Sequence, residues 1–118
     1  MLTNNPLVRD KLPQKRIEFY DTDCLGIFRA VRDKIHLGHG LLTHPLSGSV
    51  KPGETPYKTV MVTVEKGPLD EKSLFIIEES IQTYIKLNTD AAKVKKGWKE
   101  NVLADFQLID YNLIVDRE

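Results

Sequence analysis

The sequence has one cysteine, no excess charge and no long apolar run. Cys24 alone cannot form an intramolecular disulfide, which excludes a disulfide framework and fits a reducing compartment. Lys plus Arg and Asp plus Glu both number 17, so no overall field favours nucleic acid or a membrane surface. No apolar segment approaches the roughly 20 residues of a membrane span, and no signal-peptide pattern opens the chain. We therefore expect a cytoplasmic protein that binds neither nucleic acid nor membrane.

The first half of the chain alternates between strand-like and helix-like segments. Apolar and β-branched residues predict strands at MLT (1–3), RIEFY (16–20), LLTH (41–44) and KTVMVTV (58–64). Strands that alternate with helices usually form α/β layers with mostly parallel strands. The 118 residues are enough for one such domain without a structural metal. We predict a single three-layer α/β domain over 1–118, with a mostly parallel sheet of about four strands and a helical C-terminal half.

Helices are predicted where apolar residues recur at helical spacing after a capping residue. Asn5 can cap a short helix that starts at Pro6 and is stopped by Pro13. The DTD turn (21–23) supplies caps for a second helix, which the LGHG segment (37–40) ends. These signals are local, so they predict where the helices lie but not what they contact.

The C-terminal half has two longer helical patterns. Asp70 can cap a helix whose apolar stripe runs from Leu74 to Ile85. Helical spacing resumes at Ala91 and continues to Leu113, although Gly97 interrupts it and can divide it into two helices. A strand at 107–115 is the weaker alternative.

The loop within LLTHPLSGSVKPGETPYKTV (41–60) is unusually long and polar for a small domain. Ordered loops of this length usually carry a function, and ligands of α/β sheets bind beyond the carboxyl ends of the strands. The TNNP segment leaves the first predicted strand at that edge, and this loop leaves the third. We therefore predict a ligand-binding site there, formed by Asn4, Asn5, His44, Ser47, Ser49, Lys51, Thr55 and Tyr57.

The chemistry of this loop favours an anion. The segment SGSVKPGET supplies small residues, free N–H groups and Lys51, which suit a phosphate or a carboxylate. It does not match the phosphate-binding pattern GxxxxGK[ST], and the structural alternative is a turn-rich loop with a tight bend at Pro52-Gly53. Three prolines restrict the backbone, so we expect the 44–57 loop to be ordered and to line the principal pocket.

The histidines and the cysteine have structural explanations. The three histidines do not match a metal motif, so we expect no metal; His36 and His39 suit a helix C-terminus. His44 could act as an acid or a base, but no partner can be identified for it, so the catalytic residues stay unknown. Cys24 could be a low-pKa thiol near a helix N-terminus, although a buried packing residue is the stronger interpretation.

Four blocks carry a resemblance to a known family. They are TNNPLV (3–8), LGHGLLTHPLSGSVKPGETPYKTV (37–60), IIEESI (76–81) and WKENVLADFQLIDYNLI (98–114). These blocks resemble the GrdX family, short proteins encoded with the glycine reductase system of amino-acid-fermenting anaerobic bacteria. The resemblance implies a cytoplasmic location and an accessory association with glycine, sarcosine or betaine reductase. It implies no activity and no catalytic residue.

We therefore expect an accessory or ligand-binding protein without enzymatic activity and without a cofactor. Its candidate partners are a reductase component, a second copy of the chain and a small anionic ligand. The alternative is a small enzyme acting on a phosphate or carboxylate substrate, with His44 and Lys51 in a cleft lined by the 44–57 loop. An exposed apolar patch on the helices would favour a protein partner, and a nucleophile–base pair in contact would favour the enzyme.

Overall fold

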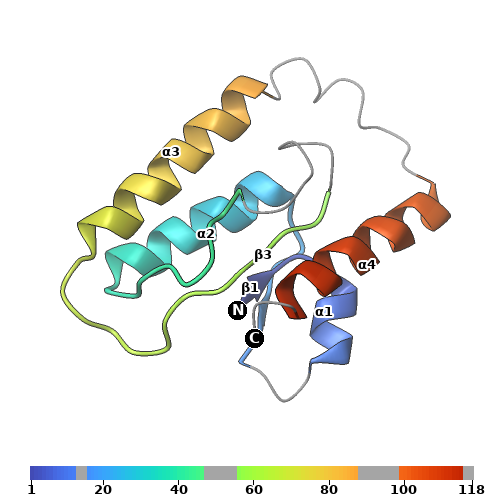
Figure 1. The fold of residues 1–118 in the computed structure, drawn as a ribbon, viewed down its shortest axis with the longest axis horizontal. Helices are drawn as coiled ribbons and strands as arrows, with labels where there is room; N and C mark the ends of the chain where they lie inside the picture. The colour runs from blue at the N-terminus through green and yellow to red at the C-terminus, as the bar shows by residue number, and fades with distance from the viewer. Residues whose placement is uncertain (13–15, 47–55, 88–98, 116–118) are drawn as a thin grey trace.

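The structure is a computed structural model that describes residues 1–12, 16–46, 56–87 and 99–115. Within these ranges it is mostly helical, with a small sheet. The elements in chain order are β1 (Leu2–Thr3), α1 (Pro6–Lys11), β2 (Glu18–Phe19), α2 (Cys24–His36), β3 (Thr59–Val60), α3 (Glu71–Leu87) and α4 (Glu100–Val115) (Figure 1). No helix in the described ranges is long and apolar enough to cross a membrane.

The sheet has β1 in its middle, in the order β2-β1-β3. Strand β2 runs parallel to β1, whereas β3 runs antiparallel to it and pairs Leu2 with Val60. The three strands lie within the predicted segments 1–3, 16–20 and 58–64. The described sheet is nevertheless mixed and three-stranded, where a mostly parallel sheet of about four strands was expected.

The predicted strand at 41–44 explains the difference. It forms one bridge, Leu41 with Val62, and runs antiparallel to the chain that continues from β3. The Leu42 N–H donates to the Met61 carbonyl (2.9 Å), and the Thr63 N–H donates to the Gly40 carbonyl (2.8 Å). Residues 40–43 therefore border the continuation of β3 instead of adding a parallel strand to the sheet.

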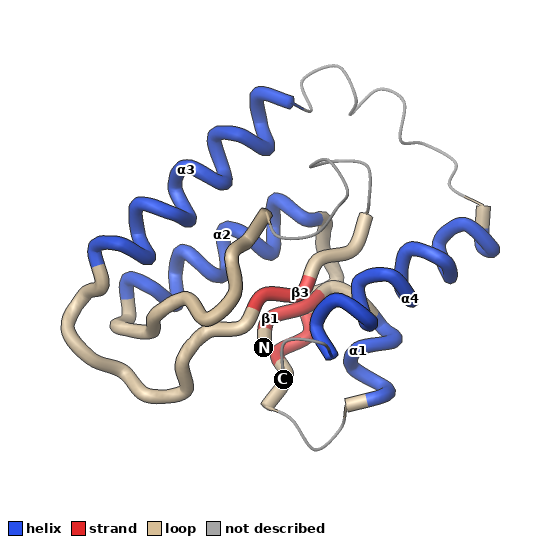
Figure 2. Tube along the Cα trace, in the orientation of Figure 1, coloured by secondary structure: helices blue, strands red, loops and turns tan. Residues whose placement is uncertain are grey.

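The two faces of the sheet differ in polarity. Leu2 and Val60 are fully buried on the face that α2 covers, and α3 packs against the outer side of α2. Because neighbouring strand residues point to opposite faces, Thr3 and Thr59 face the other side, where α4 lies. Figure 2 shows the sheet between α2 and α3 on one side and α1 and α4 on the other.

The helix starts follow the predicted caps. The Asn5 side chain accepts a hydrogen bond from the Leu7 N–H, and Pro6 is the first residue of α1. The Asp23 carboxylate accepts from the Gly26 N–H (2.8 Å) at the start of α2. Residues 107–115 belong to α4, so the alternative of a strand there is wrong. The helical pattern predicted at 91–98, Gly97 included, lies outside the described residues.

The chain reverses direction directly after α2, at Gly38. This residue has φ +108°, a left-handed conformation that glycine adopts easily. A Cβ at this position would collide with the Gly67 carbonyl, and the Gly67 N–H donates to the Gly38 carbonyl (2.9 Å). The turn places His39 beside Thr63, next to the amino ends of β1 and β2.

Candidate functional site

Asn4 ties three segments of the chain together at the carboxyl end of β1. Its Nδ2 donates to the Thr22 carbonyl (2.8 Å) and to the Pro56 carbonyl (2.9 Å). Its Oδ1 accepts from the Lys58 N–H (2.8 Å), and the residue is 5% exposed. The amide is therefore used to hold the backbone that enters β3, so a ligand would have to displace one of these bonds to reach it.

Asn5 is fully buried and joins α1 to α4. Its Oδ1 caps α1, while its Nδ2 donates to the Gln107 carbonyl (2.9 Å) and to Oδ2 of Asp110 (3.0 Å). The same side chain therefore satisfies an open helix end and a buried carboxyl group. The Asn-Pro pair signals the cap in the sequence, but the contacts with α4 depend on the fold.

Asp110 is the last residue in a short chain of hydrogen bonds. The residues of this chain form what we name the Asp110 cluster: Thr3, Asn5, Thr59 and Asp110. The Asn5 N–H donates to the Thr3 hydroxyl (3.0 Å), which lies 2.7 Å from the Thr59 hydroxyl. Thr59 in turn donates to Oδ2 of Asp110 (2.7 Å). Because each hydroxyl has one proton, this order makes Thr3 the donor to Thr59.

Burial dominates the electrostatics of this cluster. Desolvation raises the pKa of Asp110 above its ordinary value, and hydrogen bonds from Asn5 and Thr59 oppose the rise. Asp110 was not predicted as a site residue, because it lies within the apolar stretch of α4. Its position four residues before the buried Ile114, on the same side of the helix, was the available signal.

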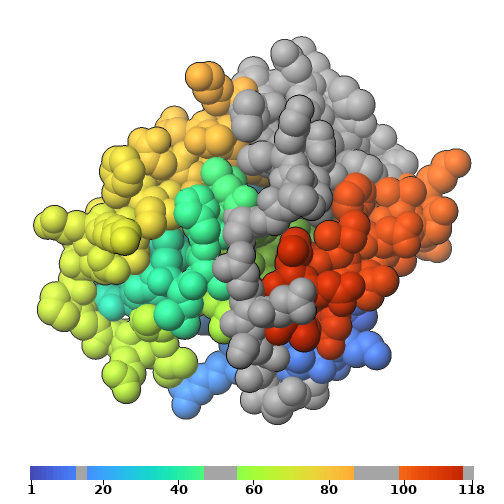
Figure 3. Space-filling model, viewed as in Figure 1, coloured from blue at the N-terminus to red at the C-terminus, as the bar shows by residue number. Residues whose placement is uncertain are grey.

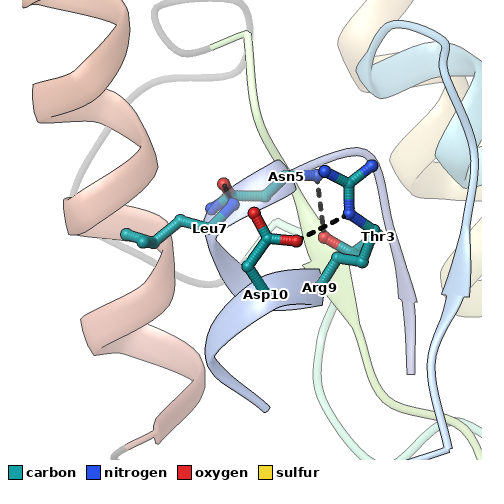
Figure 4. A network of polar contacts seen from close by, with 5 residues as sticks. All are labelled: Thr3, Asn5, Leu7, Arg9 and Asp10. Atoms are coloured by element: carbon teal, nitrogen blue, oxygen red, sulfur yellow. Dashed lines mark hydrogen bonds and ion pairs between the residues drawn. The ribbon is translucent and has the colours of Figure 1, made fainter. Parts of the chain in front are cut away.

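The exposed side of α1 carries a different polar group. Arg9 pairs with Asp10 (2.9 Å), and its guanidinium lies 4.5 Å from the centre of the Phe19 ring. Figure 4 shows this pair beside Thr3, Asn5 and Leu7. Exposed ion pairs contribute little to stability. The contact between the Arg9 guanidinium and the Phe19 ring of β2 is therefore the more stabilising of the two.

The remaining predicted site residues are distributed as follows. The Tyr57 hydroxyl accepts from Nε2 of Gln107 (2.9 Å), so Tyr57 and Asn5 contact the same residue of α4. His44 is exposed, and its Nδ1 accepts from the Leu46 N–H (3.0 Å). Four predicted residues lie outside the described ranges: Ser47, Ser49, Lys51 and Thr55. A pocket lined by the 44–57 loop therefore stays a prediction.

A cavity of about 300 Å³ lies at the other edge of the sheet, beside the amino ends of β1 and β2. Figure 3 shows a hollow there, between the yellow-green segment that follows β3 and the light-blue segment of β2. The lining residues are Met1, Leu2, Arg16, Ile17, Glu18, Lys34, His39, Val62, Thr63 and Val64. We name this space the amino-edge cavity.

Charged residues and a buried imidazole give the amino-edge cavity its polar character. Lys34 pairs with Glu18 (2.8 Å), and this contact lowers the pKa of Glu18; the Tyr20 hydroxyl also donates to that carboxylate (3.0 Å). His39 is 9% exposed, and its Nδ1 lies 2.6 Å from the Thr63 carbonyl. Since a carbonyl only accepts, Nδ1 carries the proton and Nε2 is left for another contact.

No metal site emerges from the part of the chain that the structure describes, where no three His, Cys, Asp or Glu side chains are grouped for an ion. Of the three histidines, His36 is exposed on the last turn of α2. Cys24 is 3% exposed in the main core, which agrees with a packing role.

Fold and site together define a small mixed α/β domain whose buried polar side chains mainly hold its own backbone. The chain belongs to the GrdX family: the model of the GrdX-like protein family matches residues 1–117. This match confirms the resemblance seen in the sequence over nearly the whole chain. Comparison with curated proteins and with solved structures gave no match.

Proposed function

We propose that this protein is an accessory protein of a glycine reductase-type system and that it binds a component of the reductase through helix α4. Membership of the GrdX family supports the association with this system. An apolar stripe on α4 that is exposed at Ile109 and Leu113 is the observation that supports a protein partner over the alternative of a small enzyme.

The α4 stripe consists of Val102, Phe106, Ile109 and Leu113, which follow one another at intervals of four, three and four residues. This spacing is typical of helices that pack side by side. Ile109 is 43% exposed and Leu113 is 39% exposed, although the opposite side of α4 already packs against α1 and β3. A helix that is apolar on two sides normally contacts two neighbours.

The charges of α4 favour a different protein over a second copy. The helix carries exposed Glu100 and Asp105, whereas Asp110 is buried on its other side, and it has no Lys or Arg between Glu100 and Val115. Two copies that pair along the α4 stripe would bring acidic residues next to one another, without a cation from either helix. A partner with an apolar surface flanked by Lys or Arg would complement the stripe better, and we assign this role to a reductase component.

Binding of the purified protein to each purified component of glycine, sarcosine and betaine reductase, measured by biolayer interferometry, tests the proposal. The double variant Ile109→Ser, Leu113→Ser should weaken binding to one component about tenfold or more, because truncation at the centre of an interface is costly. Phe75→Ser is the matched control, since Phe75 is 66% exposed but lies on α3.

Three outcomes would contradict the proposal. The first is that no reductase component binds the unaltered protein. The second is that Phe75→Ser weakens binding as much as the double variant does, which would remove α4 from the interface. The third is a stable dimer in light scattering that the double variant dissociates, which would make a second copy the partner of the stripe. Circular dichroism of each variant verifies that it is folded.

A further inference from the structure

We propose that the amino-edge cavity binds a small organic carboxylate, with Arg16 as the ionic contact and Nε2 of His39 as an acceptor for a hydroxyl group of the same ligand. None of the residues that line this cavity belongs to α4, so the proposal does not depend on the partner assigned to the α4 stripe. It goes beyond the proposed function because it gives the protein a small-molecule site of its own.

Folding assembles this cavity from separate segments of the chain. Its lining comes from β1, from residues 16–18, from the end of α2 with the following turn, and from residues 62–64. Its volume of about 300 Å³ lies at the lower end of the range for small-molecule sites. A ligand of a few carbon atoms is therefore a suitable size.

The charge of the cavity favours a single anionic group. The pair between Lys34 and Glu18 leaves one positive and one negative charge close together, so their sum is zero. Two further cations belong to lining residues: the Met1 ammonium, which donates to the Arg16 carbonyl (2.7 Å), and the Arg16 guanidinium, which makes no ion pair within the described residues. A guanidinium binds a carboxylate through two parallel N–H donors, which is stronger than a contact between neutral groups.

His39 supplies a fixed polar atom beside the cation. The bond from Nδ1 to the Thr63 carbonyl orients the ring, and the turn at Gly38 fixes the backbone that carries it. Nε2 makes no hydrogen bond with another described residue, although His39 as a whole is only 9% exposed. Buried polar atoms are normally hydrogen-bonded, and with the proton on Nδ1 this nitrogen is an acceptor, so it suits a hydroxyl or amino donor of the ligand and not the carboxylate itself.

The apolar part of the lining selects among anions. Ile17, Val62 and Val64 contribute hydrocarbon surface next to the charged residues. Inorganic phosphate would leave this surface without a contact, whereas a short aliphatic carboxylate covers it and still reaches Arg16. The combination of positive charge with an apolar wall therefore favours a carboxylate over phosphate.

Butyrate, its neutral amide butyramide and inorganic phosphate are the probes, and NMR titration of isotope-labelled protein is the measurement. Butyrate should shift the His39 ring signals and the amides of residues 16–18 and 62–64 saturably. Arg16→Gln should weaken this binding about tenfold, as expected for a charge-assisted contact. Arg29→Gln is the matched control, because Arg29 is exposed on α2 and does not line the cavity.

His39→Asn tests the second contact. An asparagine amide can still donate to the Thr63 carbonyl but has no counterpart of Nε2. 2-Hydroxybutyrate, whose hydroxyl can donate to Nε2, should therefore bind severalfold more tightly than butyrate to the unaltered protein but not to this variant. If this variant does not fold, Arg16→Gln still decides the matter, since Arg16 is exposed. The Ile109→Ser, Leu113→Ser variant should bind butyrate like the unaltered protein, which separates this proposal from the one on α4.

Four results would overturn the proposal. The absence of any saturable shift with butyrate would show that the cavity does not bind it, and equal binding of butyramide would remove the role of charge. Tighter binding of phosphate would contradict the choice of a carboxylate. Equal effects of Arg16→Gln and Arg29→Gln would show that Arg16 is not the ionic contact.

Discussion

Replacing Asn5 tests whether the Asp110 cluster holds the domain together. Asn5→Ala removes the cap of α1, which costs about 0.5–2 kcal/mol for residues of this type. It also removes a donor to the carboxylate of Asp110, and hydrogen bonds to charged groups contribute about 1.5–3 kcal/mol. Together we expect a loss of about 2–5 kcal/mol, a large part of the roughly 5–15 kcal/mol that stabilises a typical domain.

Asn5→Asp separates the two contributions. Aspartate caps a helix as well as asparagine does, but it has no N–H donor and brings a second carboxylate next to Asp110. Two neighbouring carboxylates raise the pKa of one of them, so this variant should lose stability as the pH rises and regain part of it in acid. Asn5→Ala adds a smaller pH dependence of the same sign, because it removes only one hydrogen bond that opposes the raised pKa of Asp110.

Urea unfolding followed by far-ultraviolet circular dichroism, at about pH 5 and about pH 8, measures both effects. Asn101→Ala, at an exposed position of α4, is the control and should change stability by less than about 0.5 kcal/mol. The reasoning fails if Asn5→Ala costs no more than this control. It also fails if the difference between the Asp and Ala variants of Asn5 is the same at both pH values.

Three further predictions concern single positions. Burial raises the pKa of Asp110, so the native state keeps its proton better than the unfolded chain; this contribution lowers stability as pH rises from the ordinary carboxyl range to the raised pKa. Asp110→Asn keeps an acceptor for Asn5 and Thr59, and urea titrations over pH should show a flatter profile; an unchanged slope would contradict this. Gly38→Ala should cost about 1–3 kcal/mol in thermal unfolding because of its positive φ and the Gly67 carbonyl. Gly67→Ala, with nothing within 4 Å of its added Cβ, is the control and should be nearly neutral. Cys24 is 3% exposed, so a thiol reagent should modify it slowly in the native protein and rapidly in urea; rapid native modification would support the alternative of an accessible reactive thiol.

Local features of the fold could be predicted from the sequence. The Asn5-Pro6 pair and Asp23 specify where α1 and α2 begin, because a cap needs only its own neighbours. The direction of β3 could not be predicted in the same way. It depends on how residues 40–43 pair with the chain after β3, and this contact joins segments far apart in the sequence.

The candidate site could likewise be predicted only in part, because its residues follow from local sequence but their contacts depend on the fold. Asn4 and Asn5 were identified because polar residues follow a strand, but their partners at Pro56, Lys58 and Asp110 required the fold. The expectation of a crevice at the carboxyl edge assumed a mostly parallel sheet. With β3 antiparallel to β1, the carboxyl ends of the three strands do not share one edge, and this explains how a cavity can lie at the amino ends of β1 and β2.

The position of β1 between its two neighbours has a consequence for biosynthesis. A ribosome that has made β1 and β2 has still to make β3, whose Val60 pairs with Leu2, and α4 comes later again. Until then Leu2 lacks its antiparallel partner, and Asn5 lacks Asp110. Contacts between such distant segments form slowly and late. The nascent chain can therefore complete its sheet only after Val60 has been made, and its polar cluster only after Asp110 has been made.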